Sequence, residues 1–160
     1  MKLRCAIIDD EYLARQYISD YVQKVPFLEL KGDYNSPLKA IDQIKSGKID
    51  LLFLDIQMPD ITGLEFLKTL DKAPFVIITT AYKEYALEGY ELNVTDYLLK
   101  PFSFERFLKA VNKVLEMKEK MSGSGAQLSD EQSETTLHDE YIVIRADRKH
   151  YKVNYDDLFY

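Results

Sequence analysis

The chain has 160 residues, of which 46% are hydrophobic and 30% are charged, and its formal net charge is −6. This length suffices for one ordinary domain and part of a second. There is no apolar run of about 18 residues, which argues against a membrane span, and Asp9 and Asp10 interrupt the N-terminal apolar run too early for a signal peptide. Because the lone Cys5 cannot form an internal disulfide, these features together favour a cytoplasmic protein that contacts no membrane.

Short apolar runs alternate with segments of helical spacing along the first 120 residues. We expect strands at residues 3–8, 28–34, 50–54, 75–79 and 97–99. We expect helices at residues 12–25, 38–44, 63–70, 83–92 and 104–117. The run at 51–54 is apolar at every position, which is typical of a strand buried on both faces.

Five strand–helix repeats of this kind predict an α/β fold: a doubly wound five-stranded parallel sheet with five helices that cover its two faces. In such sheets the reactive crevice lies at the carboxyl ends of the strands. The residues that directly follow each strand are therefore the candidates for a functional site.

The sequence changes in character after residue 120. Residues 121–138 are polar, lack apolar periodicity and contain Ser-Gly-Ser-Gly at 122–125, which predicts a flexible linker, although such a repeat is also typical of an engineered insert. Residues 141–146 and 150–154 then predict a β-hairpin. We therefore expect a first domain at 1–120, a linker at 121–138, and a short β fragment at 139–160 that is too small to be stable alone.

Polar side chains follow four of the expected strands. They are Asp9 and Asp10 after the first, Asp55 after the third, Thr79 and Thr80 at the end of the fourth, and Lys100, followed by Pro101, after the fifth. Because the carboxyl ends of parallel strands meet at one edge of the sheet, we expect three carboxylates, a hydroxyl and an ammonium group to converge there.

Three neighbouring carboxylates repel one another unless a cation lies between them. A hard divalent ion such as Mg²⁺, or Mn²⁺ in its place, prefers carboxylate and carbonyl oxygens and water. We therefore assign Asp10 and Asp55 as direct metal ligands, and Asp9 as a direct or water-mediated one. Gln57, two residues after Asp55, would contribute its backbone carbonyl.

Asp55 is also a candidate nucleophile, because a carboxylate can attack phosphorus to form an aspartyl phosphate. The metal ion and the Lys100 ammonium would offset charge on the phosphoryl oxygens, and the Thr80 hydroxyl could donate a hydrogen bond to one of them. Each residue alone has an ordinary structural explanation: an aspartate before a helix is often an N-cap, and a threonine in a strand reflects β propensity. Their occurrence together at one sheet edge favours a phospho-acceptor site.

In this order, these residues resemble the receiver domain of bacterial two-component response regulators. The matching positions are the acidic pair Asp9-Asp10, the segment 51–59 around Asp55, Gly63, Thr80-Ala81, Tyr97 and Lys100-Pro101. The resemblance covers residues 1–120 and implies a flavodoxin-like, CheY-like fold with strand order 2-1-3-4-5.

The family resemblance implies a signalling switch rather than a turnover enzyme. A sensor histidine kinase would transfer a phosphoryl group to Asp55 in a Mg²⁺-dependent reaction, and the domain would later remove it by self-catalysed hydrolysis. Thr80 and Tyr97 would act as switch residues, Lys100 would contact the phosphoryl group, and the Lys100–Pro101 peptide bond would be cis. On activation the chain would form a homodimer through its fourth helix, fifth strand and fifth helix.

The run at 79–86 resembles, more narrowly, receivers that are joined to LytTR-type DNA-binding domains, as in LytR/AlgR-like transcriptional regulators. Residues 141–160 are similar to the opening strands of that mostly β domain. The resemblance therefore implies a truncated output domain, and it implies DNA binding only through the complete output domain.

Three other functions fit the pattern less well. A phosphatase of the haloacid-dehalogenase type needs a second acid two residues after its nucleophile, where this chain has Gln57. A Rossmann nucleotide-binding protein needs a glycine-rich first turn, whereas Asp9, Asp10 and Glu11 would repel phosphate. An interaction module that works without phosphorylation, with a vestigial pocket, remains the third alternative.

Overall fold

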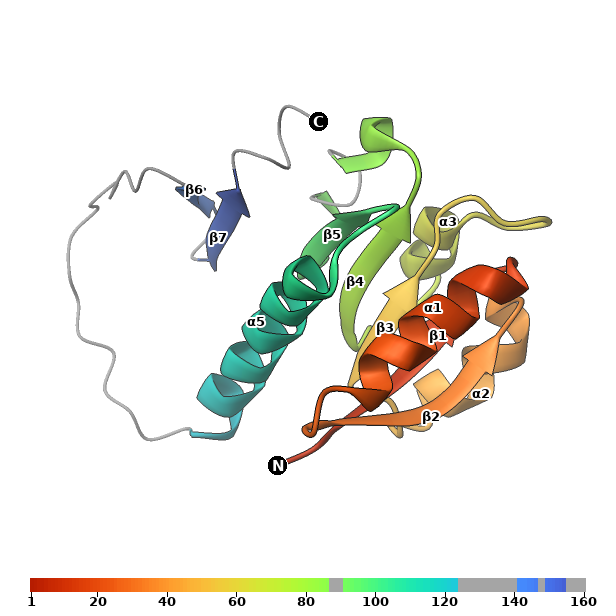
Figure 1. Ribbon diagram of the computed structural model, residues 1–160, viewed down its shortest axis with the longest axis horizontal. Coiled ribbons are helices and arrows are strands. Elements are labelled where there is room, and N and C mark those ends of the chain that lie inside the picture. The colour runs from red at the N-terminus through yellow and green to blue at the C-terminus, as the bar shows by residue number, and fades with distance from the viewer. Residues whose placement is uncertain (87–90, 124–140, 147–148, 155–160) are drawn as a thin grey trace. The chain divides into compact units, whose positions relative to one another are not determined.

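The computed structural model describes residues 1–86, 91–123, 141–146 and 149–154, and the chain divides into two units, Met1–Ser122 and Gly123–Tyr160 (Figure 1). Each unit has its own sheet.

The first unit is built on a five-stranded parallel sheet. Its strands are β1 (Leu3–Ile8), β2 (Leu28–Tyr34), β3 (Leu51–Leu54), β4 (Phe75–Thr80) and β5 (Asp96–Leu99), in the spatial order β2-β1-β3-β4-β5. β3, at the centre, is buried at every residue, as expected for a strand covered on both faces. The predicted α/β fold and its 2-1-3-4-5 strand order are therefore confirmed.

Helices cover both faces of this sheet. α1 (Tyr12–Gln23) and α5 (Phe104–Ser122) lie on one face, and α2 (Pro37–Lys45) and α3 (Gly63–Lys68) lie on the other (Figure 1). The helix expected at 83–92 opens with a 3₁₀ turn, Lys83–Tyr85, and its residues 87–90 lie outside the described part of the chain. Among the described residues, no helix is both long enough and apolar enough to cross a bilayer.

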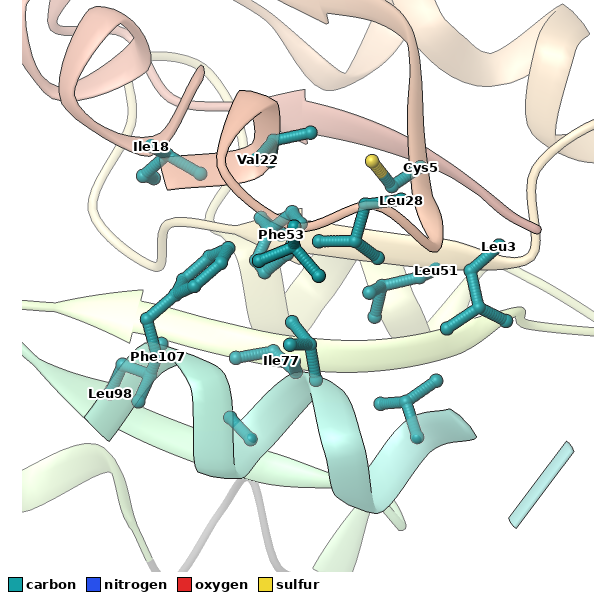
Figure 2. Packing of buried hydrophobic residues seen from close by; sticks show 14 of the residues in the cluster. Leu3, Cys5, Ile18, Val22, Leu28, Leu51, Phe53, Ile77, Leu98 and Phe107 are labelled. Carbon is teal, nitrogen blue, oxygen red and sulfur yellow. The ribbon is translucent and has the colours of Figure 1, made fainter. Parts of the chain in front are cut away.

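Two hydrophobic clusters join the helices to the sheet. In the first, Ile18 and Val22 of α1 and Phe107 of α5 pack on strand residues that include Phe53 (Figure 2). The rings of Phe53 and Phe107 stack with their centroids 5.3 Å apart. Cys5 is buried in the same cluster, and burial raises the pKa of its thiol to about 12, as expected for a cysteine that serves as a packing residue.

α5 is longer than the sequence predicts. We expected it to end at residue 117 and the linker to begin at 121, but the helix continues to Ser122. Lys118 of α5 forms an ion pair with Asp50, with 2.6 Å between Nζ and Oδ1, so the last turns remain tied to the start of β3. Residues 124–138 of the expected linker lie outside the described residues.

The second unit contains an antiparallel hairpin of β6 (Tyr141–Ala146) and β7 (Lys149–Asn154). Tyr141 pairs with Asn154 and Ala146 pairs with Lys149. The hairpin predicted from the sequence is therefore confirmed, with β7 beginning one position earlier than expected.

Candidate functional site

The register of the sheet places three carboxylates next to one another. Ile8 of β1 pairs with Leu54 of β3, so the residues that follow them, Asp9 and Asp55, leave adjacent strands side by side. Asp9 is fully buried and Asp55 is 6% exposed, whereas Asp10 is exposed. One carboxylate oxygen from each of the three lies within 4.8 Å of the others.

Local hydrogen bonds orient these acids. Oδ1 of Asp9 accepts a hydrogen bond from the Glu11 amide at 2.9 Å, and the Asp9 backbone carbonyl accepts one from Nη1 of Arg15 at 2.8 Å. Oδ1 of Asp55 accepts a hydrogen bond from the Ile56 amide at 2.8 Å. Arg15 is a site residue that the sequence analysis did not single out, although a cation near the start of the helix that follows the acidic pair could have indicated it.

Lys100 brings the only ammonium that contacts these acids among the described residues. Its Nζ lies 2.6 Å from Oδ2 of Asp9 and 3.8 Å from Oδ2 of Asp55. Its backbone amide donates to the Thr80 carbonyl at 2.7 Å, which ties it to the end of β4. The Lys100–Pro101 peptide bond is cis, the isomer that the family resemblance implied.

Burial and neighbouring charges together perturb the titration of Asp55. Burial raises the pKa of this carboxyl to about 7, and the charge of Asp9 adds to the effect while the Lys100 ammonium opposes it. Crowded, buried carboxylates behave in this way until a cation joins them. An arrangement of oxygen ligands alone, with excess negative charge, fits a hard divalent ion such as Mg²⁺ or Mn²⁺.

The loop after β3 is closely packed beneath Asp55. The Gly63 amide donates to the Ile56 carbonyl at 2.8 Å, and a Cβ at Gly63 would overlap the backbone carbonyl of Asp55. Thr62 and Glu65 form a capping box that starts α3 directly after this contact. The loop between Asp55 and α3, which contains Gln57, is therefore fixed at both ends.

The two threonines at the end of β4 differ in their contacts. Both are fully buried. The Thr80 hydroxyl accepts a hydrogen bond from the Tyr82 amide at 3.3 Å, while the Thr79 hydroxyl has no hydrogen-bond partner within the described part of the chain. The structure thus places Thr80 at the predicted edge, but with its hydroxyl engaged by its own loop rather than by the acids.

Aromatic side chains tie the loop after β4 to its surroundings. The Tyr97 hydroxyl donates to the Tyr82 carbonyl. Burial raises the pKa of Tyr97 above its usual value, and the charge of Glu84 adds to the effect. On the other side, Nε2 of Gln57 donates to the Tyr85 hydroxyl at 3.1 Å, a contact between two loops that the sequence did not reveal.

Comparisons with known proteins agree with this geometry. Residues 5–112 match the family model of the response regulator receiver domain, so the chain belongs to that family. An uncharacterized response regulatory protein of Vibrio cholerae is 39% identical over 120 residues, which are 74% of this chain and 51% of the relative. The sensory transduction protein LytT of Enterococcus faecalis is 33% identical over 156 residues, which are 96% of this chain and 62% of LytT.

The solved structures show the same fold. The response regulatory domain of protein mrkE from Klebsiella pneumoniae superposes with a TM-score of 0.68 at 30% sequence identity, over 74% of this chain and 99% of that one. The chain spans about half the length of several curated relatives that it matches. It is a two-component response regulator receiver with an acidic pocket formed by Asp9, Asp10 and Asp55.

Proposed function

We propose that Asp55 accepts a phosphoryl group from a sensor histidine kinase in a Mg²⁺-dependent reaction. The observation that carries this proposal is the convergence of three carboxylates within 4.8 Å of one another, with the Lys100 ammonium 3.8 Å from Oδ2 of Asp55. Mn²⁺ would fit the same oxygen ligands. We further propose the ligand set Asp9, Asp10, Asp55 and the Gln57 backbone carbonyl.

In the proposed reaction, a carboxylate oxygen of Asp55 attacks the phosphorus of the kinase phosphohistidine. The new O–P bond forms as the P–N bond breaks, and the electron pair of the P–N bond leaves with the imidazole, which takes up a proton from water. Lys100 would exchange its contact with Asp9 for one with a phosphoryl oxygen and so offset developing charge. A bound Mg²⁺ supplies further positive charge at the transferring group.

Phosphorylation would then change what Thr80 and Tyr97 contact. The phosphoryl group brings a charge of about −1.5 to −2 and strong acceptor oxygens. We propose that the Thr80 hydroxyl leaves the Tyr82 amide and donates to one of these oxygens. The Tyr82 segment would shift with it, which would release the Tyr97 hydroxyl from the Tyr82 carbonyl and let the ring turn inward.

We propose a LytTR-type DNA-binding output for the whole protein. In support, the similarity to LytT covers 96% of this chain and so reaches beyond the receiver match at 5–112. In this proposal residues 1–120 are the receiver, 121–138 are a linker and 139–160 begin the output domain. Specific DNA binding would require the complete output domain, and activation would favour a homodimer through the fourth helix, β5 and α5.

The test is intact mass after incubation with acetyl phosphate and Mg²⁺. We expect one added phosphoryl group on the wild-type chain and none on Asp55→Asn or on a sample with the metal chelated. The phosphatase and Rossmann alternatives predict no stable adduct. Failure to label under conditions that label another receiver would favour an interaction module that works without phosphorylation.

A further inference from the structure

Two phenols of α1 converge on one backbone carbonyl of the loop between β5 and α5. The Tyr17 hydroxyl lies 2.7 Å from the Phe102 carbonyl oxygen, and the Tyr21 hydroxyl lies 3.2 Å from the same oxygen. The two phenol oxygens are 2.6 Å apart. The two contacts with Phe102 join positions more than 80 residues apart in the sequence.

The distances indicate which phenol donates to the carbonyl. Each phenol has one proton, and a separation of 2.6 Å between two oxygens requires that one phenol donate to the other. The shorter distance to the Phe102 carbonyl, 2.7 Å against 3.2 Å, favours Tyr17 as the donor to that carbonyl and Tyr21 as the donor to the Tyr17 oxygen. The longer 3.2 Å approach of Tyr21 to the carbonyl is a secondary contact that becomes available if the Tyr17 hydroxyl is removed.

Aromatic packing holds this phenol pair in place. The Tyr21 ring lies 5.3 Å, between centroids, from the rings of both Phe104 and Phe107, and the Tyr17 ring meets the edge of Phe102 at 5.7 Å. The hydrogen bond with Tyr17 raises the pKa of Tyr21 to about 12, with a smaller contribution from burial. Ring packing and the hydrogen bond between the two phenols thus hold both hydroxyls near the Phe102 carbonyl.

The carbonyl that receives these bonds belongs to the loop that carries Lys100. On the strand side, the Lys100 amide donates to the Thr80 carbonyl. On the helix side, the Ser103 hydroxyl accepts from the Arg106 amide at 3.1 Å and begins α5. Between these two anchors, Phe102 is held by the phenols of α1, two residues after Lys100, whose Nζ contacts Asp9.

We propose that Tyr17 and Tyr21 are positioning residues for Lys100: their hydroxyls hold the β5–α5 loop so that the ammonium faces the acidic pocket. The inference rests on the proposed role of Lys100 in phosphorylation of Asp55. The hydroxyls of Tyr17 and Tyr21 would act through the loop, because they contact the Phe102 carbonyl and not the reacting atoms.

The experiment uses the 160-residue chain with Tyr17→Phe, Tyr21→Phe and the double variant, which retain both rings and remove the hydroxyls. The matched control is Tyr12→Phe, an exposed tyrosine of the same helix for which the structure shows ring packing on Arg15 rather than a phenol hydrogen bond. Two quantities are measured: hydrogen exchange of the Lys100 amide, and the rate of Asp55 phosphorylation by acetyl phosphate with Mg²⁺.

We expect Lys100 amide exchange to be faster by roughly 5-fold or more in the double variant, and phosphorylation to be slower by a similar factor, since each lost hydrogen bond is of modest net value. Tyr17→Phe should have a smaller effect than the double variant, because the Tyr21 hydroxyl can still reach the Phe102 carbonyl. Tyr21→Phe should have the smallest effect of the three, because the shorter hydrogen bond from Tyr17 to that carbonyl remains. Tyr12→Phe should match the wild type. In a Lys100→Met background, the tyrosine substitutions should have no further effect on the phosphorylation rate.

The outcomes separate this inference from the function on which it rests. Two results in the double variant would overturn the positioning role: unchanged exchange of the Lys100 amide, or faster exchange with an unchanged phosphorylation rate. In either case, labelling of the wild type at Asp55 would still support the proposed function. A wild-type chain that is not labelled at Asp55 would instead overturn the proposed function, and the exchange measurement would then report only on the loop. A tyrosine effect that persists in full without Lys100 would show that the hydroxyls act elsewhere.

Discussion

At the scale of single residues, the site depends on a few side chains whose surroundings are unfavourable until a ligand arrives. Asp55 is buried beside Asp9, and its pKa is raised to about 7. Its charge thus opposes folding in the absence of a cation, and a bound divalent ion would relieve that cost.

This predicts a pH-dependent gain in stability for Asp55→Asn in metal-free buffer. The pKa of Asp55 is about 7 in the folded state and 3.8 in the unfolded reference state. Between these two pH values the folded state therefore binds more protons than the unfolded state, and the stability of the wild type falls as the pH rises through this window. Above pH about 7.5 the variant should be more stable than the wild type by on the order of 2–4 kcal/mol, with little difference near pH 4. Urea unfolding at several pH values measures this, with the exposed Asp20→Asn as control. An equal difference at both ends of the range would contradict it.

Gly63 is the residue whose small size the site requires most directly. A Cβ there would overlap the Asp55 carbonyl, which belongs to backbone and cannot swing away. We expect Gly63→Ala to lower the free energy of unfolding by about 2 kcal/mol or more. Gly32→Ala is the matched control, because its Cβ would meet the ring end of Tyr34, a side chain that can move. Equal losses in both variants, measured by urea unfolding, would show that contact with the Asp55 carbonyl is not the cause.

At the scale of elements, an ion-pair cluster ties the end of α5 to the start of β3. Asp50 accepts from the Arg4 backbone amide and Nε at 2.9 Å each, and pairs with Lys118 of α5 at 2.6 Å. Burial disfavours the Asp50 carboxylate, but the hydrogen bonds from Arg4 and Lys118 outweigh it and lower the pKa below its usual value. The stability that this pairing provides is present above the unfolded pKa of 3.8 and is lost as pH falls below it.

We therefore expect Asp50→Asn to destabilise the fold at neutral pH by roughly 1–3 kcal/mol, since it leaves two cations without their partner. The control is Glu105→Gln, which breaks an exposed pair with Lys109 within α5 and should cost less than about 0.5 kcal/mol. Urea unfolding compares the two. A loss no larger than that of the control would contradict the anchoring role of Asp50.

The sequence was most informative where one strong physical rule acts. β3 is apolar at every position because both of its faces are covered, so the parallel sheet and the edge that gathers Asp9, Asp55 and Lys100 could be predicted. The helix end at 117 was wrong, because the ion pair between Lys118 and Asp50 depends on tertiary structure that no local pattern encodes.

The finer contacts of the site could not be predicted for the same reason. Three such contacts join segments that are far apart in the chain. They are the ion pair of Lys100 with Asp9, the hydrogen bond between Gln57 and Tyr85, and the hydrogen bond of Tyr17 to the Phe102 carbonyl. Their residues have unremarkable local spacing. Only the assembled sheet brings them together.

At the scale of the whole molecule, the proposal predicts that phosphorylation changes the state of association. If the fourth helix, β5 and α5 form a dimer surface on activation, sedimentation velocity of the wild-type chain with acetyl phosphate and Mg²⁺ should show a larger dimer fraction than without them. Asp55→Asn under the same conditions should have the same dimer fraction as the untreated wild type. A dimer fraction that is the same in all three samples would remove dimerisation by this chain from the proposal and leave phosphorylation itself untouched.

The most direct measurement of the central claim is to locate the phosphoryl group. The chain is incubated with acetyl phosphate and Mg²⁺ and treated with borohydride, which reduces an aspartyl phosphate to homoserine, and peptide mass spectrometry then identifies the altered position. We expect homoserine at position 55, with Asp9 and Asp10 unchanged, and no conversion when the metal is chelated. Conversion at Asp9 or Asp10 in place of Asp55, or no conversion at all, would contradict it.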